Sequence, residues 1–342
     1  MMASTGPYPS ANSTNEVATS VTSLANFIPE IWEDETIAEY KANLVLRNNV
    51  RVMNHRGQKG DTIHIPTPNR AAANQKVEHD AVALIYEAET KVQISIDQHY
   101  HYAKLIEDIG AVQALNAQRR FYTDDMAYSL AKRVDASIGD QAKEFGKSTY
   151  DYDGAVIGSD GSTSWSTATS GNGASLTDAG IRRAIRTLDD NDVPNSERSL
   201  SIPPIEKESL LGIARFTEQA FVGEAGAANA IRNGMFGQLY GVSVFVTTNL
   251  PGASGIDAYD NPVQSADSTQ YIACILMHRS AIVLVEQVGI RVQSQYKLEH
   301  LGDLLVADCL WGVKAVRSGY TATASTNVAA EQAGVALIVP ST

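Results

Sequence analysis

Cysteine and charge are scarce in this sequence, and basic residues are the scarcer charge. Only Cys274 and Cys309 occur among 342 residues. This excludes a disulfide scaffold and a four-cysteine zinc site, and predicts two buried thiols. Charged residues make up 19% of the chain, and 27 Lys and Arg stand against 39 Asp and Glu, a net charge of −12. The acidic excess argues against a general nucleic-acid binder, and so low a charged fraction is typical of a subunit that covers part of its surface with partners.

Long hydrophobic runs are also absent. The longest, at 271–277 and 280–285, are far shorter than the ~20 residues that cross a membrane. The N-terminal segment has neither the basic nor the apolar part of a secretory signal. The length allows about two domains, and an apolar content of 44% supports a sizeable core. We therefore expect a soluble protein of a reducing compartment that does not contact a membrane.

Motifs of catalysis are missing as well. The chain has neither the phosphate-binding loop G-x-x-x-x-G-K-[ST] nor the nucleophile elbow G-x-S-x-G. Asp151, Asp153 and Gly154 begin like a calcium loop, but the twelfth position is Ser162 rather than glutamate. We predict no catalytic residue and no cofactor.

Asp97, His99 and His101 are the best candidates for metal ligands. Residues two apart on a strand share a face, so both imidazoles could meet one ion and Asp97 could add a carboxylate. The alternative is a polar strand face that contacts solvent or a partner. We adopt this alternative and predict no metal site.

The N-terminal third predicts extended structure. Residues 1–25 are polar and predict a mobile arm, followed by the apolar anchor FIPEIW at 27–32 and a helix that ends near 47. Apolar and polar residues then alternate at 61–66, and again over 91–102, where Val92, Ile94, Ile96, Tyr100 and Tyr102 share one face. Two such strands, joined across a polar stretch, would form a long hairpin that extends from the body.

A long amphipathic helix is predicted over 111–145, because apolar residues recur there every three or four positions. The alternative is an ordinary core helix broken at Gly139. The rest of the chain predicts shorter elements: a flexible Gly/Ser/Thr insertion at 146–175, helices over 177–190, 205–213 and 278–288, strands over 198–202, 242–248, 271–277, 289–296 and 304–320, and a tail at 321–342.

Five phrases in this order resemble the major capsid proteins of tailed bacteriophages, which share the HK97 fold. They are FIPEIW, GDTIHIPTP before the predicted hairpin, KVQISIDQHYHYAKLIEDI as its return strand, RNGMFGQLYGVSVFVTTNL, and LMHRSAIVLVEQVGIRVQSQY. The last phrase is especially similar to the coat proteins of short-tailed podoviruses. The resemblance spans residues 25–320.

The resemblance implies an α+β subunit of the HK97-like capsid fold. Its parts would be an N-terminal arm (1–56), an extended β-hairpin loop (57–102), a peripheral domain with a long spine helix (103–145 and 271–320), an axial domain (146–270) and a C-terminal tail (321–342). It also implies a non-enzymatic major capsid protein of the virion, whose pentamers and hexamers form an icosahedral shell around packaged double-stranded DNA. Implied partners are other copies of the chain, a scaffolding protein, a portal and a decoration protein, with DNA bound without sequence specificity and assembly in the host cytoplasm.

Two other classes stay open on the residues alone. A surface-layer or tail-associated structural protein would have separable β-sandwich domains, and the predicted helix over 111–145 argues against it. An α/β enzyme built on 175–250 would need a pocket with a residue of shifted pKa, and no motif supports it.

Overall fold

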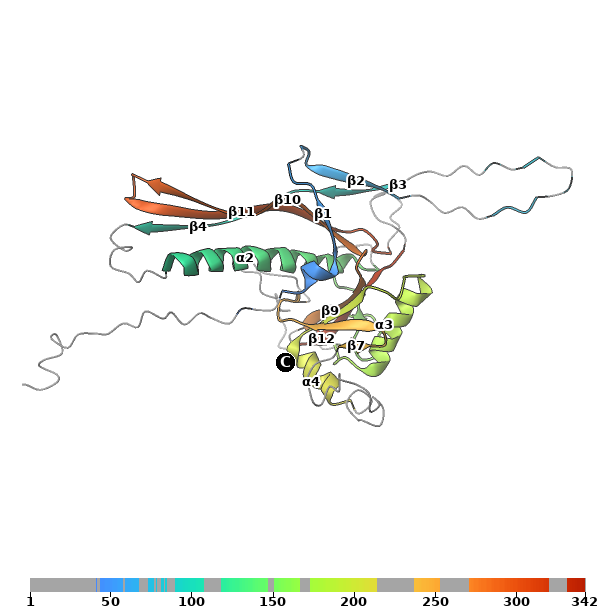
Figure 1. Ribbon diagram of the computed structural model, residues 1–342. Coiled ribbons are helices and arrows are strands. Elements are labelled where there is room, and N and C mark those ends of the chain that lie inside the picture. Colours follow the sequence, from blue (N-terminus) through green and yellow to red (C-terminus); the bar gives the residue numbers. More distant parts are fainter. Residues whose placement is uncertain are drawn as a thin grey trace, which may run out of the picture.

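The computed structural model (Figure 1) describes residues 41, 44–57, 59–67, 73–76, 78, 81–82, 84, 90–107, 118–146, 151–166, 173–213, 237–252, 271–319 and 331–341. Its strands are β1 (Arg51–Asn54), β2 (Thr62–Thr67), β3 (Thr90–Ser95), β4 (Gln98–Glu107), β5 (Val156–Ile157), β6 (Arg198–Ile202), β7 (Gln238–Leu239), β8 (Val242–Val246), β9 (Tyr271–His278), β10 (Ile282–Lys297), β11 (Gly302–Ala315) and β12 (Gly334–Pro340). Its helices are α2 (Gln118–Asp140), α3 (Asp178–Asp190) and α4 (Pro204–Leu211), with the 3-10 helices η2 (Leu46–Asn49) and η3 (Gln141–Glu144). The predicted arm and anchor lie outside the described residues. None of the described helices is long and apolar enough to cross a membrane.

Two sheets form the body, with α2 along one of them (Figure 1). The four-stranded sheet has the order β1-β10-β11-β4, and the six-stranded sheet has the order β5-β12-β9-β6-β8-β7. Strand β9 alternates between two cores: Ile275 and Met277 pack in the core that includes α2, whereas Cys274 and Leu276 pack in the core that includes α3. Because one sheet carries both cores, the described residues do not divide into the separable sandwiches of the surface-layer alternative.

Helix α2 confirms the predicted long helix from residue 118 onward. Met126, Leu130, Val134 and Ile138 follow one another at four-residue steps, and all four are buried. The helix runs through Gly139 to Asp140 and continues as η3, so the structure favours the predicted long helix over the alternative of a break at the glycine. A Cβ at this glycine would lie 3.0 Å from Cδ of the Pro251 ring, so its absence lets that segment approach the helix closely.

The predicted hairpin is confirmed at its root. Strands β2 and β3 pair antiparallel, from Thr62 opposite Ser95 to Thr67 opposite Thr90. Apolar side chains of β3 and β10, with one residue directly after β3 and one directly after β11, form a small separate core, composed of Val92, Ile94, Ile96, Val283, Val285 and Val316. This core fixes the hairpin root to the body, from which the hairpin projects (right in Figure 1).

The single strand predicted over 91–102 is wrong, because the chain changes sheets at 96–97. Strand β3 pairs with β2, whereas β4 pairs with β11. Gly312 of β11 lies against this change of direction: a Cβ there would come within 2.2 Å of the Ser95 carbonyl oxygen. The Ile96 N–H group donates to the Asp61 carbonyl at 2.7 Å. The side-chain alternation continues across the step, so the sequence pattern does not reveal it.

The helix predicted over 278–288 is also wrong. The chain turns at 279–280 and then forms the first half of β10, which pairs with β1 on one side and β11 on the other. Ile282, Val283 and Val285 are β-branched and buried, which favours a central strand. Pairing on both sides satisfies the backbone of this apolar stretch.

The flexible insertion predicted at 146–175 is wrong for its central part. Trp165 is buried and packs edge-to-face on Tyr271, with 5.8 Å between the ring centroids. The Asp160 carboxylate accepts the Thr163 N–H group at 3.0 Å and so fixes the turn before the tryptophan. A long-range aromatic contact and a local side-chain cap therefore order a segment whose composition is typical of a loop.

The α/β unit that follows is confirmed, but its sheet is larger than predicted. Helix α3 begins after Thr177, whose hydroxyl accepts the Gly180 N–H group at 3.2 Å. Strand β9 lies in 271–320, which was predicted to belong to the peripheral domain, and β12 lies in the predicted tail 321–342. The two strands pair with each other, and β9 also pairs with β6. The tail prediction is therefore wrong for 334–340, which forms an internal strand of this sheet.

Candidate functional site

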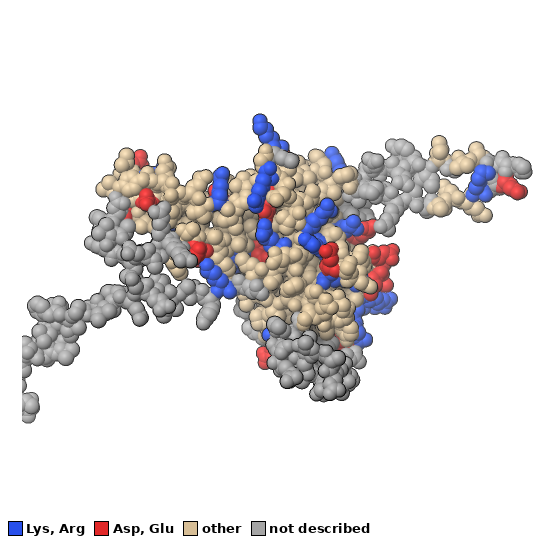
Figure 2. Space-filling view, in the orientation of Figure 1, with Lys and Arg blue, Asp and Glu red and all other residues tan. Residues whose placement is uncertain are grey.

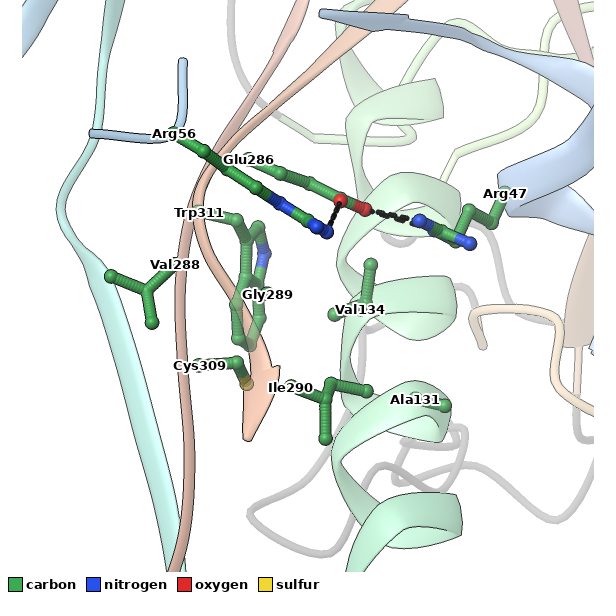
Figure 3. Close-up of a pocket in the computed structure, with 10 residues that line it drawn as sticks. All are labelled: Arg47, Arg56, Ala131, Val134, Glu286, Val288, Gly289, Ile290, Cys309 and Trp311. Carbon is green, nitrogen blue, oxygen red and sulfur yellow. Dashed lines mark hydrogen bonds and ion pairs between the residues drawn. The ribbon is translucent and has the colours of Figure 1, made fainter. Parts of the chain in front are cut away.

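A cavity of about 260 Å³ opens between the four-stranded sheet and α2 (Figure 3). One end of the lining is charged and the remainder is apolar. The principal lining side chains are Arg47, Arg56, Glu286, Val134, Ile290 and Trp311.

Glu286 lies between two arginines at the charged end (Figure 3). Arg47 donates from Nε at 3.0 Å and from Nη2 at 2.6 Å to Oε1, whereas Arg56 donates from Nη2 to Oε2 at 3.1 Å. The Glu286 side chain is 11% exposed, and the arginine side chains are 52% and 57% exposed. Two cations thus bind one mostly buried carboxylate, Arg47 at Oε1 and Arg56 at Oε2. We call these three residues the Glu286 clamp.

Strand pairing brings the clamp together. Strand β1 runs parallel to β10 as far as Glu286, whose carbonyl accepts the His55 N–H group at 2.9 Å. The register between β10 and β11 then shifts before Val288, as at a β-bulge. Gly289 leaves room for the guanidinium, since a Cβ there would lie 2.5 Å from Nη2 of Arg56.

Asp135 of α2 holds the segment that carries Arg47. Its carboxylate is buried and accepts the Arg47 N–H group at 3.0 Å and Nδ2 of Asn249 at 3.3 Å. Burial raises the pKa of Asp135, and the hydrogen bonds from Arg47 and Asn249 oppose the rise. One side chain of α2 therefore binds both η2 and the segment after β8.

Burial also raises the pKa of three groups in the core, Glu206, Cys274 and Cys309. Burial raises the pKa of Glu206, whose Oε2 accepts the Leu176 N–H group at 2.7 Å. Both cysteines are buried, as predicted. Burial raises the pKa of Cys274 well above its usual value and that of Cys309, which lines the cavity, to about 12. A thiol with a raised pKa is a weak nucleophile, so the cavity thiol does not support the enzyme alternative.

The structure does not bring the three candidate metal ligands together. Asp97 precedes β4, His99 and His101 lie on it, and all three residues are exposed. Nε2 of His99 lies 3.6 Å from Oδ2 of Asp308, a carboxylate that Arg291 already binds at 2.7 and 2.8 Å. Within the described residues, no three His, Cys, Asp or Glu side chains are grouped so that they could hold a metal ion.

Exposed apolar side chains gather at two places. Val82 and Leu84, on the hairpin beyond β2, are 69% and 96% exposed; we call them the hairpin surface. Ile290, Val292 and Tyr296 share one face of β10 and are 41–44% exposed; we call them the edge surface. Because β1 pairs with β10 only up to residue 286, the described strands leave one edge of β10 without a neighbour from there on. The end of the sheet that carries this edge shows few charges (left in Figure 2).

Sequence reasoning did not single out the Glu286 clamp. The two arginines lie 239 and 230 residues from the glutamate along the chain, so no spacing rule connects them. The available signal was a lone carboxylate in the apolar run IVLVEQV, which calls for a cationic partner once the run is buried.

Comparison with known proteins places these features in a family and a fold. A family model described as phage capsid protein matches residues 35–301. Among solved structures, a chain from Mycobacterium phage Che8 is 22% identical with a TM-score of 0.64, covering 91% of this chain and 97% of that one. The capsid structure of the cyanophage P-SCSP1u is 16% identical with a TM-score of 0.67, covering 98% and 99%. The acidic stable capsid structure of Helicobacter pylori bacteriophage KHP30 is 12% identical with a TM-score of 0.66, covering 96% and 100%. No curated protein matches the sequence. These likenesses confirm the α+β, HK97-like fold.

Proposed function

Since this chain belongs to the phage capsid protein family, we propose that it assembles into pentamers and hexamers that close an icosahedral shell around packaged double-stranded DNA. As a coat protein of the virion it is a structural protein, whose role is to bury surface against other copies, without catalysis or a cofactor. The observation that carries the proposal is the pair of exposed apolar surfaces on one chain. Exposed apolar clusters of this kind mark interaction sites.

The two surfaces suit each other. The edge surface combines apolar side chains with an unpaired stretch of β10 backbone, which is what strand addition uses. The hairpin surface places its apolar side chains at positions 82 and 84, two residues apart, so both would face the same side once this segment pairs as a strand. We therefore place the hairpin of one subunit along the β10 edge of the next. Because two different surfaces meet, the contact is head-to-tail and can close into a ring.

We assign the four-stranded sheet and α2 to the peripheral domain, the six-stranded sheet with α3 and α4 to the axial domain, the segment 57–102 to the extended loop, and 1–56 to the N-terminal arm. Strands β9 and β12 belong to the axial domain in this assignment, because they pair within its sheet. Loops of the axial domain would meet at the five- and six-fold axes of the shell.

The remaining partners follow from the family resemblance. We propose a separate scaffolding protein, a portal and room for a decoration protein, with assembly in the host cytoplasm. The net charge of −12 supports DNA contained without sequence-specific contacts, because an acidic inner wall repels the DNA backbone and keeps it from adhering.

Electron microscopy of the full chain, co-expressed with its scaffolding protein, tests the proposal. We expect closed shells, and a stable compact monomer at all concentrations in sedimentation would overturn the proposal. Deleting residues 71–80 should leave the isolated subunit folded while lowering shell yield. If the deletion unfolds the subunit, that segment is core and its assignment to the loop is wrong.

A matched pair of variants tests the proposed contact itself. Replacing Val82 and Leu84 together by Ser should lower shell yield, because the hairpin surface loses its apolar side chains. Phe121→Ser is the control, since Phe121 is 37% exposed and lies outside both surfaces. Equal shell yields from the two variants would contradict the contact.

A further inference from the structure

Glu286 lies where two segments of the chain, the one after the proposed N-terminal arm and the one before the hairpin, meet the body. Arg47 follows the N-terminal segment, Arg56 directly precedes the hairpin, and both side chains end on the same carboxylate. We propose that Glu286 is a positioning residue for assembly, which fixes the exits of both extensions so that they take their assembly-competent directions together. This inference rests on the proposed shell function and adds a coupling between the two extensions.

The hairpin exit is held by consecutive residues of β10. The Glu286 carbonyl accepts the His55 N–H group, and its carboxylate binds Arg56. The next residue, Gln287, donates from Nε2 to the Gly60 carbonyl at 3.0 Å. Residues 55, 56 and 60 are therefore fixed in a row, immediately before β2 begins.

The N-terminal exit is held from two sides. The Arg47 backbone N–H group donates to Asp135 of α2, and its guanidinium donates to Glu286 of β10. The 3-10 helix η2 therefore spans the distance between helix and sheet. A rotation of this segment would have to break one of the two attachments.

A shared, mostly buried carboxylate couples the two exits. Removing either arginine leaves one oxygen of the mostly buried Glu286 carboxylate without the donor that it has in the clamp. A buried acceptor that loses its donor costs free energy, so the carboxylate turns that oxygen toward water. The adjoining cavity of about 260 Å³ leaves room for this movement. The contact to the remaining arginine then lengthens, and loosening at one exit reaches the other.

The same strand offers a matched control. Arg291 binds Asp308 at 2.7 and 2.8 Å, and their side chains are 55% and 13% exposed, which is close to the values in the Glu286 clamp. This pair joins β10 to β11, with His99 of β4 3.6 Å from Asp308, and it contacts neither Arg47 nor Arg56 in the described structure. Arg291→Ala therefore measures the effect of losing an ion pair of β10, whereas Arg47→Ala and Arg56→Ala measure the effect of losing a contact to the shared carboxylate.

Hydrogen–deuterium exchange on the full, unassembled chain tests the coupling. In Arg56→Ala we expect the amides of 45–49 to exchange about tenfold faster, although Arg56 forms its ion pair with Glu286 alone, since a hydrogen bond to a charged group is worth about that factor. Arg47→Ala should have the same effect on 55–61, and Arg291→Ala should change neither segment. Faster exchange confined to the neighbourhood of each substituted arginine would overturn the proposal. Arg56→Lys keeps the charge and loses the fork of donors, so it should give a smaller change in the same direction, and its result decides the matter if the alanine variant does not fold.

Electron microscopy of the same variants separates this inference from the function on which it rests. Arg56→Ala should yield fewer shells than Arg291→Ala. If the unmodified chain forms shells but exchange at the distant exit is unchanged, the positioning role fails alone. If the unmodified chain forms no shells although the exits are coupled, the proposed function fails and the role in assembly fails with it.

Discussion

Removing the carboxylate of Asp135 should destabilise the unassembled subunit strongly. Its buried carboxylate accepts the Arg47 N–H group at 3.0 Å and Nδ2 of Asn249 at 3.3 Å. In Asp135→Ala the Arg47 N–H group loses its buried acceptor and Asn249 loses one of its two acceptors, so we expect a loss of about 2–3 kcal/mol in the free energy of unfolding.

Asp135→Asn separates the acceptor from the charge. Asparagine keeps one oxygen for the Arg47 N–H group but presents an NH2 group where Oδ2 now accepts Nδ2 of Asn249 at 3.3 Å. Asn249 also donates to the Lys132 carbonyl at 3.3 Å, so it keeps a partner. We expect the asparagine variant to lose only about 1 kcal/mol.

The pH dependence supplies a second test of Asp135. Burial raises the pKa of this carboxyl in the folded subunit, so its contribution to stability is present below the unfolded pKa of about 3.9 and is lost as pH rises through the folded pKa. Asparagine does not titrate, so the deficit of Asp135→Asn against the unmodified subunit should shrink between pH 4 and pH 7. Urea unfolding at both pH values measures these differences. Equal losses for the alanine and asparagine variants, or a deficit that grows with pH, would refute the reasoning.

Three further predictions concern the ordered loop, the hairpin root and the histidine face. Trp165→Ala should lower the free energy of unfolding by about 3–5 kcal/mol. A change below about 0.5 kcal/mol, measured by thermal unfolding, would instead support the prediction of a flexible insertion at 146–175. Gly312→Ala should cost about 1–3 kcal/mol and raise amide exchange in β3, because its Cβ would collide with the Ser95 carbonyl; unchanged exchange would show that the root does not depend on this contact. Replacing His99 and His101 by Gln should leave shell yield unchanged, and elemental analysis that found one metal per subunit, lost with both histidines, would contradict it.

The elements that the sequence predicted correctly are those whose pattern of apolar and capping residues is the same whichever distant segment packs against them. Helix α2 shows its buried stripe in the sequence because one side of a helix faces one core. The hairpin root shows period two because one face of β3 packs on β10. Thr177 caps α3 through a hydrogen bond three residues away, which is a local interaction.

The wrong predictions depend on partners far away in the chain. The run IVLVEQV has apolar residues at both helical and strand spacings, and only pairing with β1 and β11 decides for a strand. Trp165 is ordered by Tyr271, over a hundred residues later. The final strand β12 joins β9 and β5, so a terminal apolar stretch that looked like a tail completes a sheet.

The face of β4 that carries His99 and His101 shows that strand register, and not the period of the sequence, determines which side chains lie beside them. Period two correctly places His99 and His101 on one exposed face, but it also assigns Asp97 to the same strand, and the chain changes sheets at that residue. The partner of His99 comes instead from β11, where Asp308 lies opposite position 101 and diagonal to position 99. Since Arg291 reaches the same carboxylate from β10, the face brings together side chains from three strands: Arg291 of β10, Asp308 of β11 and His99 of β4. A search within one strand would find two ligands of a metal, whereas the register across the sheet supplies the ion pair that occupies their nearest carboxylate.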